Sequence, residues 1–84
     1  MENKLLTIFN TYGKSHQVSK LLEEVGEFIE TVMNEDKENM VQEMADVSVM
    51  LVQFKAYYNL DSNNIIDIMH QKIDRQLDRI EKEK

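Results

Sequence analysis

The sequence contains no cysteine, no proline and no tryptophan, and it has only two glycines. Without cysteine the chain has neither disulfides nor a thiolate zinc site, and this absence fits a reducing compartment. No apolar run approaches the length of a membrane span, and the N-terminus lacks a basic-then-apolar signal pattern. These absences predict a cytoplasmic protein that does not bind a membrane.

Basic residues are also scarce, because ten lysines and arginines stand against sixteen aspartates and glutamates, for a formal net charge of -6. That charge argues against binding a nucleic acid polymer, which needs a basic face. It does not exclude a small phosphate ligand, since a metal ion can reverse the local sign of an acidic site. We expect one small domain, residues 1–84. A domain of this size has a marginal core, so oligomerisation or a hard metal ion would help to stabilise it.

Helix-favouring residues are frequent and no stretch alternates as a strand does, so the predicted fold class is all-α. We expect four helices, at about 3–12, 15–33, 37–58 and from 62 onward. Helix-boundary residues precede or follow each of them, and these are Gly13, Ser15, Asp36, Asn59, and Asp61 or Ser62. The expected architecture is a short N-terminal helix, an antiparallel helical hairpin and a C-terminal helix.

Apolar residues on the second helix fall on one wide stripe, which we expect to face the core: Val18, Leu21, Leu22, Val25, Phe28, Ile29 and Val32. The third helix is apolar almost all the way round from Met44 to Tyr58. A helix that is apolar on every side is buried on every side, and this short chain can hardly surround it. We therefore predict that a homodimer or homotetramer completes a four-helix-bundle core.

The sequence contains two pairs of carboxylates, each with a spacing of three residues. Glu24 and Glu27 lie outside the apolar stripe of the second helix, and Glu43 and Asp46 lie on the third helix. Residues three apart are neighbours on a helix, and a tight turn packs the two helices antiparallel. Four carboxylates would then converge, and their repulsion would either raise some of their pKa values or require a cation. Ligation by oxygen alone suits Mg²⁺ or Mn²⁺.

Each of these features also has a simpler interpretation. A Glu-x-x-Glu pair is usually a solvated helix face. Asp46 is more informative, because it lies among apolar residues on a helix expected to be buried. His16 and His70 are isolated, and we interpret both as surface residues. The fourth helix carries basic residues at helical spacing, which suit phosphate binding or an ordinary charged surface: Lys72, Arg75 and Arg79.

The segments 20–27 (KLLEEVGE) and 43–47 (EMADV) resemble the all-α nucleoside triphosphate pyrophosphatases of the MazG type. That superfamily includes dimeric dUTPases and phosphoribosyl-ATP pyrophosphatases. Its signature is Glu-Glu-x-x-Glu, a spacer and Glu-x-x-Asp, and the spacer here is 28–42. Segment 72–75 is similar to the basic stretch on the last helix of these proteins.

The resemblance implies Mg²⁺-dependent hydrolysis of a (d)NTP to a (d)NMP and pyrophosphate, with Mn²⁺ as a possible substitute. It implies four metal ligands: Glu24, Glu27, Glu43 and Asp46. It implies two catalytic residues, Glu24 to position or deprotonate the water and Glu23 to support it. Three basic residues would bind phosphate: Lys20, Lys72 and Arg75.

Neither the residues nor the resemblance names the base or the sugar. Phe9 and Tyr12 could stack on a base or belong to the core of the first helix. An alternative function is a non-catalytic helical oligomerisation module or a nucleotide-sensing regulatory module.

Overall fold

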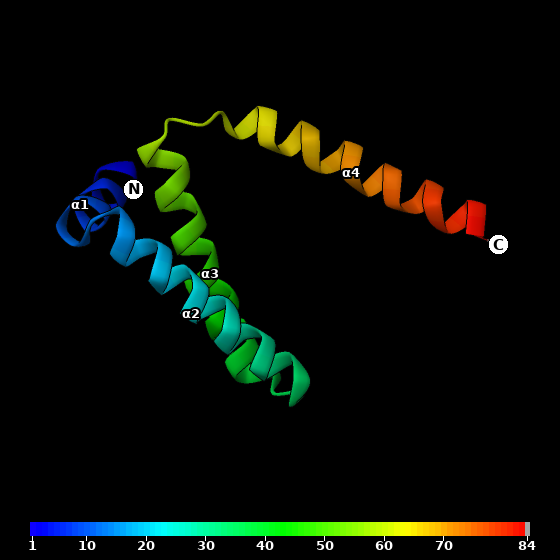
Figure 1. The fold of residues 1–84 in the computed structure, drawn as a ribbon, viewed down its shortest axis with the longest axis horizontal. Coiled ribbons are helices and arrows are strands. Elements are labelled where there is room, and N and C mark those ends of the chain that lie inside the picture. Colours follow the sequence, from blue (N-terminus) through cyan, green and yellow to red (C-terminus); the bar gives the residue numbers. More distant parts are fainter. Residues whose placement is uncertain (84) are drawn as a thin grey trace.

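The computed structural model describes residues 1–83, which form four helices and no strand: α1 (Glu2–Tyr12), α2 (Lys14–Met33), α3 (Lys37–Tyr57) and α4 (Ser62–Glu83). Helices α2 and α3 form an antiparallel pair, and α1 packs across one end of it (Figure 1). The predicted all-α class is confirmed, and the boundaries agree with the expected ones to within one or two residues. Within the described residues, no helix is both long and apolar enough for a membrane span.

Gly13 alone separates α1 from α2. Its φ of 86° lies in the left-handed region, which glycine enters without a Cβ clash. Its N–H donates to the Phe9 carbonyl at 2.8 Å, and its carbonyl accepts from the Gln17 N–H at 3.0 Å. Gly13 therefore ends one helix and begins the next. The predicted cap at Ser15 is wrong, because α2 already includes that residue.

The other two connections have the predicted caps. The Asp36 carboxylate accepts from the Asn39 backbone N–H at 3.2 Å at the start of α3. The Asp61 carboxylate accepts from the Asn63 N–H at 2.9 Å at the start of α4. Each bond satisfies one of the backbone donors that a helix N-terminus leaves free. Short polar side chains therefore set both helix starts, as the sequence predicted.

The core lies where α1 meets α3. Phe9 is 1% exposed, its ring stacks on Tyr57 at 4.3 Å between centroids, and it meets Phe54 edge-on at 5.3 Å. Met50 is the other buried apolar residue among those described. Phe9 thus belongs to the core, and its alternative role as a base-stacking residue is excluded.

The predicted inward face of α2 is wrong for a single chain. Its apolar stripe is largely exposed, with Leu22 at 76%, whereas Gln17 and Glu24 are buried. The polar face of α2 packs on α3 with one edge of the stripe half-buried beside it, at Leu21, Val25 and Phe28, and the rest of the stripe faces outward. The spacing of apolar residues identified a stripe correctly, but it could not say which element covers that stripe.

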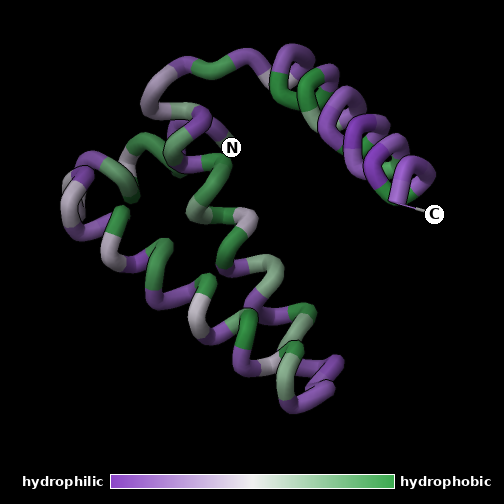
Figure 2. Tube along the Cα trace, turned by 45° about the vertical axis from the view of Figure 1, so that its right-hand side comes forward, coloured by the Kyte–Doolittle hydropathy of each residue, from purple (hydrophilic) through white to green (hydrophobic). Residues whose placement is uncertain are grey.

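Helix α4 extends away from the other three helices, to which a short connection joins it (Figure 1). All of its described residues are exposed. Hydrophobic positions recur along it between charged ones (Figure 2), and they form one stripe: Ile65, Ile66, Met69, Ile73, Leu77 and Ile80. One chain therefore does not close a four-helix bundle.

Candidate metal centre

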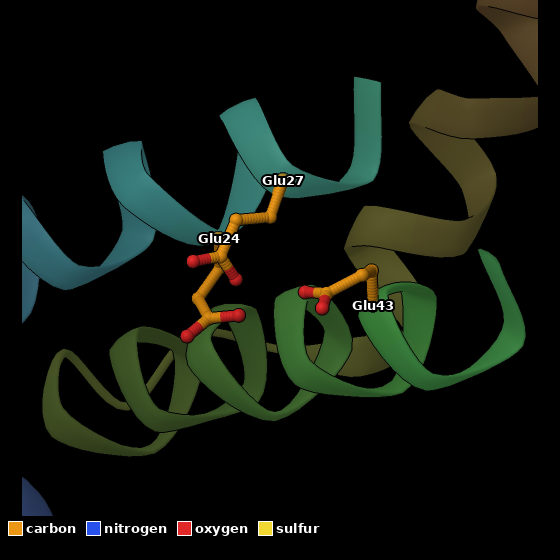
Figure 3. Close-up of side chains that lie close together, drawn as sticks. All are labelled: Glu24, Glu27 and Glu43. Carbon is orange, nitrogen blue, oxygen red and sulfur yellow. The ribbon is translucent and has the colours of Figure 1, made fainter. Parts of the chain in front are cut away.

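Three carboxylates meet between α2 and α3. Glu24 and Glu27 lie one turn apart on α2, and Glu43 points toward them from α3 (Figure 3). One carboxylate oxygen from each residue lies within 4.8 Å of the other two. The three side chains converge because the Asn34–Asp36 turn is short and the polar face of α2 is the one that packs on α3.

Two of these carboxylate oxygens are buried without a hydrogen-bond partner in residues 1–83: Glu24 Oε2 and Glu43 Oε2. Glu24 as a whole is only 6% exposed. An ionised oxygen that is shielded from water without a donor is destabilised. The fold alone gives these atoms no partner, so the cluster has the character of a ligand site.

The cluster shifts the pKa of its members in opposite directions. Burial and the neighbouring carboxylates of Glu27 and Glu24 raise the pKa of Glu43 to about 7. The pKa of Glu24 is lowered instead, mainly because Lys20 donates a hydrogen bond to it. Glu24 is therefore ionised near neutral pH, while Glu43 is divided between its two forms.

Lys20 contacts the cluster from within α2. Its Nζ lies 3.0 Å from Glu24 Oε1 and 3.7 Å from Glu23 Oε1. The hydrogen bond with Glu24 and the charge of Glu23 raise the pKa of Lys20. Glu23 is itself more than half exposed and lies outside the three-carboxylate group. Lys20 thus supplies the one cation that the described chain places on the carboxylates.

The remaining residues expected at the site lie apart from it in a single chain. Asp46 is exposed, so its predicted burial is wrong here, and it lies outside the group formed by the other three carboxylates. Lys72 and Arg75 are on α4, which extends away from the cluster (Figure 1). One chain brings together Glu24, Glu27 and Glu43 but does not add the basic residues of α4.

The sequence model of the MazG nucleotide pyrophosphohydrolase domain matches residues 13–80. The chain belongs to this MazG family. No curated protein and no solved structure matches it significantly. The matched part of the MazG domain begins at Gly13 and includes all of α2 and α3, so it contains all three clustered carboxylates.

The donor set of this MazG domain fits a divalent metal ion. Three carboxylates without nitrogen or sulfur donors suit a hard cation that accepts oxygen ligands. A cation among them would give Glu24 Oε2 and Glu43 Oε2 a partner, and it would reduce the repulsion that raises the pKa of Glu43. Glu24, Glu27 and Glu43 are the residues that would hold it.

A second feature of the MazG domain was missed from the sequence. Gln17 on α2 and Gln53 on α3 are 3% and 2% exposed, and Gln17 Nε2 donates to Gln53 Oε1 at 2.7 Å. They line a cavity of about 480 Å³ together with Lys20. The available signal was helical spacing, since Gln17 precedes Glu24 by two turns and so shares its face.

Proposed function

We propose that the chain hydrolyses a (d)NTP to a (d)NMP and pyrophosphate in the presence of Mg²⁺, with Mn²⁺ as a substitute. The observation that carries the proposal is the cluster of Glu24, Glu27 and Glu43 inside a MazG domain, with two buried oxygens that lack a protein partner. Phosphate groups carry the same negative charge as these carboxylates, so a metal ion is needed to bring the two together.

The proposed reaction is attack of water on the α phosphorus, which breaks the bond to the bridging oxygen and releases pyrophosphate. Bound Mg²⁺ would neutralise phosphate oxygens and make the attacking water more acidic. Glu24 is proposed to position or deprotonate that water as a metal ligand, because its Oε2 has no protein partner and would lie next to the bound ion. Glu23 is proposed to act through Lys20, which it holds at 3.7 Å.

Phosphate binding is proposed for Lys20, Lys72 and Arg75. Lys20 lies closest to the carboxylates and is partly exposed, so it can exchange Glu24 for a phosphate oxygen. Lys72 and Arg75 belong to α4, so they would act in an assembly in which α4 reaches the carboxylates of another copy. Asp46 remains a proposed fourth metal ligand, one turn from Glu43.

Assembly into a homodimer or homotetramer is part of the proposal. The outward stripe of α2 and the stripe of α4 both leave large apolar side chains exposed, among them Leu22, Ile29, Ile73 and Leu77. Small domains with such faces usually bury them against another copy. The cytoplasmic location suggested by the composition stays a prediction.

The test is pyrophosphate release from a panel of canonical and modified triphosphates with Mg²⁺. Glu24→Gln and Glu43→Gln should each abolish release, whereas Glu38→Gln, on the exposed first turn of α3, should not. A folded protein that binds Mg²⁺ but releases no pyrophosphate from any of them would contradict the proposal. It would favour the alternative of a nucleotide-sensing module, and absence of Mg²⁺ binding would favour a non-catalytic oligomerisation module.

A further inference from the structure

The cavity beside the carboxylates combines aromatic rings with buried amides. Tyr12 and His16 line it, and their rings stack at 4.9 Å with an interplanar angle of 20°. Gln17 and Gln53 also line it, and Lys20 connects it to the cluster through Glu24. Flat rings and fixed amides are the surfaces that recognise a planar heterocycle, by stacking and by hydrogen bonds to its edge.

Hydrogen bonds fix which end of each of the two amides is the oxygen and which is the nitrogen. Gln17 Oε1 lies 2.9 Å from His16 Nδ1, and Gln17 Nε2 donates to Gln53 Oε1. Each amide oxygen is therefore paired with a donor. In this arrangement His16 donates from Nδ1, since an amide oxygen only accepts.

The amide nitrogens are much less well satisfied than the oxygens. Gln53 Nε2 has only the Met50 sulfur as an acceptor, at 3.9 Å, and a thioether is a weak acceptor. Gln17 Nε2 uses one of its two N–H groups on Gln53, and no acceptor within residues 1–83 takes the other. A buried amide that lacks acceptors is costly, by roughly 1–3 kcal/mol. The cavity thus presents N–H donors that a ligand oxygen would satisfy.

We propose that this cavity binds the base of the nucleotide and that the Gln17 and Gln53 amides donate to a ring carbonyl of that base. The inference rests on the proposed function and adds a substrate class to it. It selects nucleotides of uracil, thymine, cytosine, guanine or hypoxanthine, which carry a ring carbonyl, over those of adenine, which do not.

The spacing along α2 supports this arrangement. Gln17 precedes Glu24 by seven residues, which is roughly 10 Å along the helix. Lys20 lies between them on the same face. A base at the glutamines would leave room for a sugar next to Lys20 and would place the phosphates at the carboxylates. The base, sugar and phosphates would therefore follow one face of one helix.

Adenine is disfavoured by the polarity of its hydrogen-bonding groups and not by its size. Its exocyclic amino group is a donor, so in the position of the ring carbonyl it would face the amide donors and could not accept from them. Sites built to hydrogen-bond one group discriminate strongly against an analogue that lacks it. Loss of one such bond corresponds to about a tenfold change or more in kcat/KM.

The sharpest test compares dITP with dATP, which have the same ring system and differ at the 6-oxo or 6-amino position. We expect kcat/KM for dITP to exceed that for dATP by about tenfold or more in the unmodified protein. In Gln53→Met this preference should fall to within about threefold, because methionine keeps the volume and removes the donor. Gln42→Met, at an exposed position of α3, should keep the preference.

The outcomes separate the two proposals. Hydrolysis of both nucleotides at equal kcat/KM by the unmodified protein overturns base selection and leaves the hydrolase standing. A preference that Gln53→Met retains, in a variant with unchanged helicity by circular dichroism, also overturns the role of the amides. If no triphosphate is hydrolysed, calorimetric binding of dITP and dATP decides: tighter binding of dITP supports the cavity, and equal binding or none overturns it.

Discussion

Replacing Glu43 with glutamine should remove the pH dependence of Mg²⁺ binding. Burial and the neighbouring carboxylates of Glu27 and Glu24 raise the pKa of Glu43 to about 7. Its proton must leave before the carboxylate can bind Mg²⁺, so the affinity should fall as the pH is lowered through that value. Glutamine cannot ionise, so Glu43→Gln should bind Mg²⁺ weakly and without this pH dependence.

The size of the effect follows from the ratio of protonated to ionised Glu43. With a pKa of about 7, this ratio is about ten at pH 6 and about one-tenth at pH 8. The apparent Kd for Mg²⁺ should therefore be about tenfold higher at pH 6 than at pH 8. Binding should release about 0.9 proton at pH 6 and about 0.1 proton at pH 8.

Isothermal titration calorimetry in two buffers with different ionisation enthalpies measures the protons released. Glu38→Gln is the matched control, because it removes a carboxylate from α3 at an exposed position away from the cluster. It should reproduce both the affinities and the proton release of the unmodified protein. Equal proton release at the two pH values, or unchanged release in Glu43→Gln, would refute the reasoning.

Three further predictions concern stability and assembly. In chelator, folded Glu43 keeps its proton between its ordinary pKa of 4.5 and about 7 while the unfolded chain loses it, so stability should fall as pH rises through this window. Urea denaturation at several pH values measures this fall in stability. Glu43→Gln should remove the part of the fall that comes from the titration of Glu43. Phe9→Ala should lower the free energy of unfolding by about 3 kcal/mol, because it removes the ring that stacks on Tyr57; the exposed Lys82→Met should change it by less than about 0.5 kcal/mol. Leu77→Asp, on the exposed stripe of α4, should give a smaller species in sedimentation equilibrium, and a monomer before substitution would contradict the proposed assembly.

Local features of the sequence were sufficient for the helices and for the caps of α3 and α4, whereas the cap expected at Ser15 was wrong. Asp36 and Asp61 cap helices because a short carboxylate reaches the free N–H groups of the first turn, and this depends only on neighbouring residues. Helical periodicity and a short turn also place Glu24 and Glu27 at the height of Glu43, but their convergence further requires that the polar face of α2 packs on α3. Their role as metal ligands stays a prediction.

The packing of faces was decided only by the tertiary structure. Periodicity shows that α2 has an apolar stripe and a polar face, but it does not say which of them meets α3. In the single chain the polar face does, so Glu24 is buried, while Leu22 and Asp46 are exposed. The Gln17–Gln53 bond joins residues 36 positions apart, and helical spacing places Gln17 on the face of Glu24 without pairing it with Gln53. Burial depends on what lies opposite a residue, which the sequence of one helix does not contain.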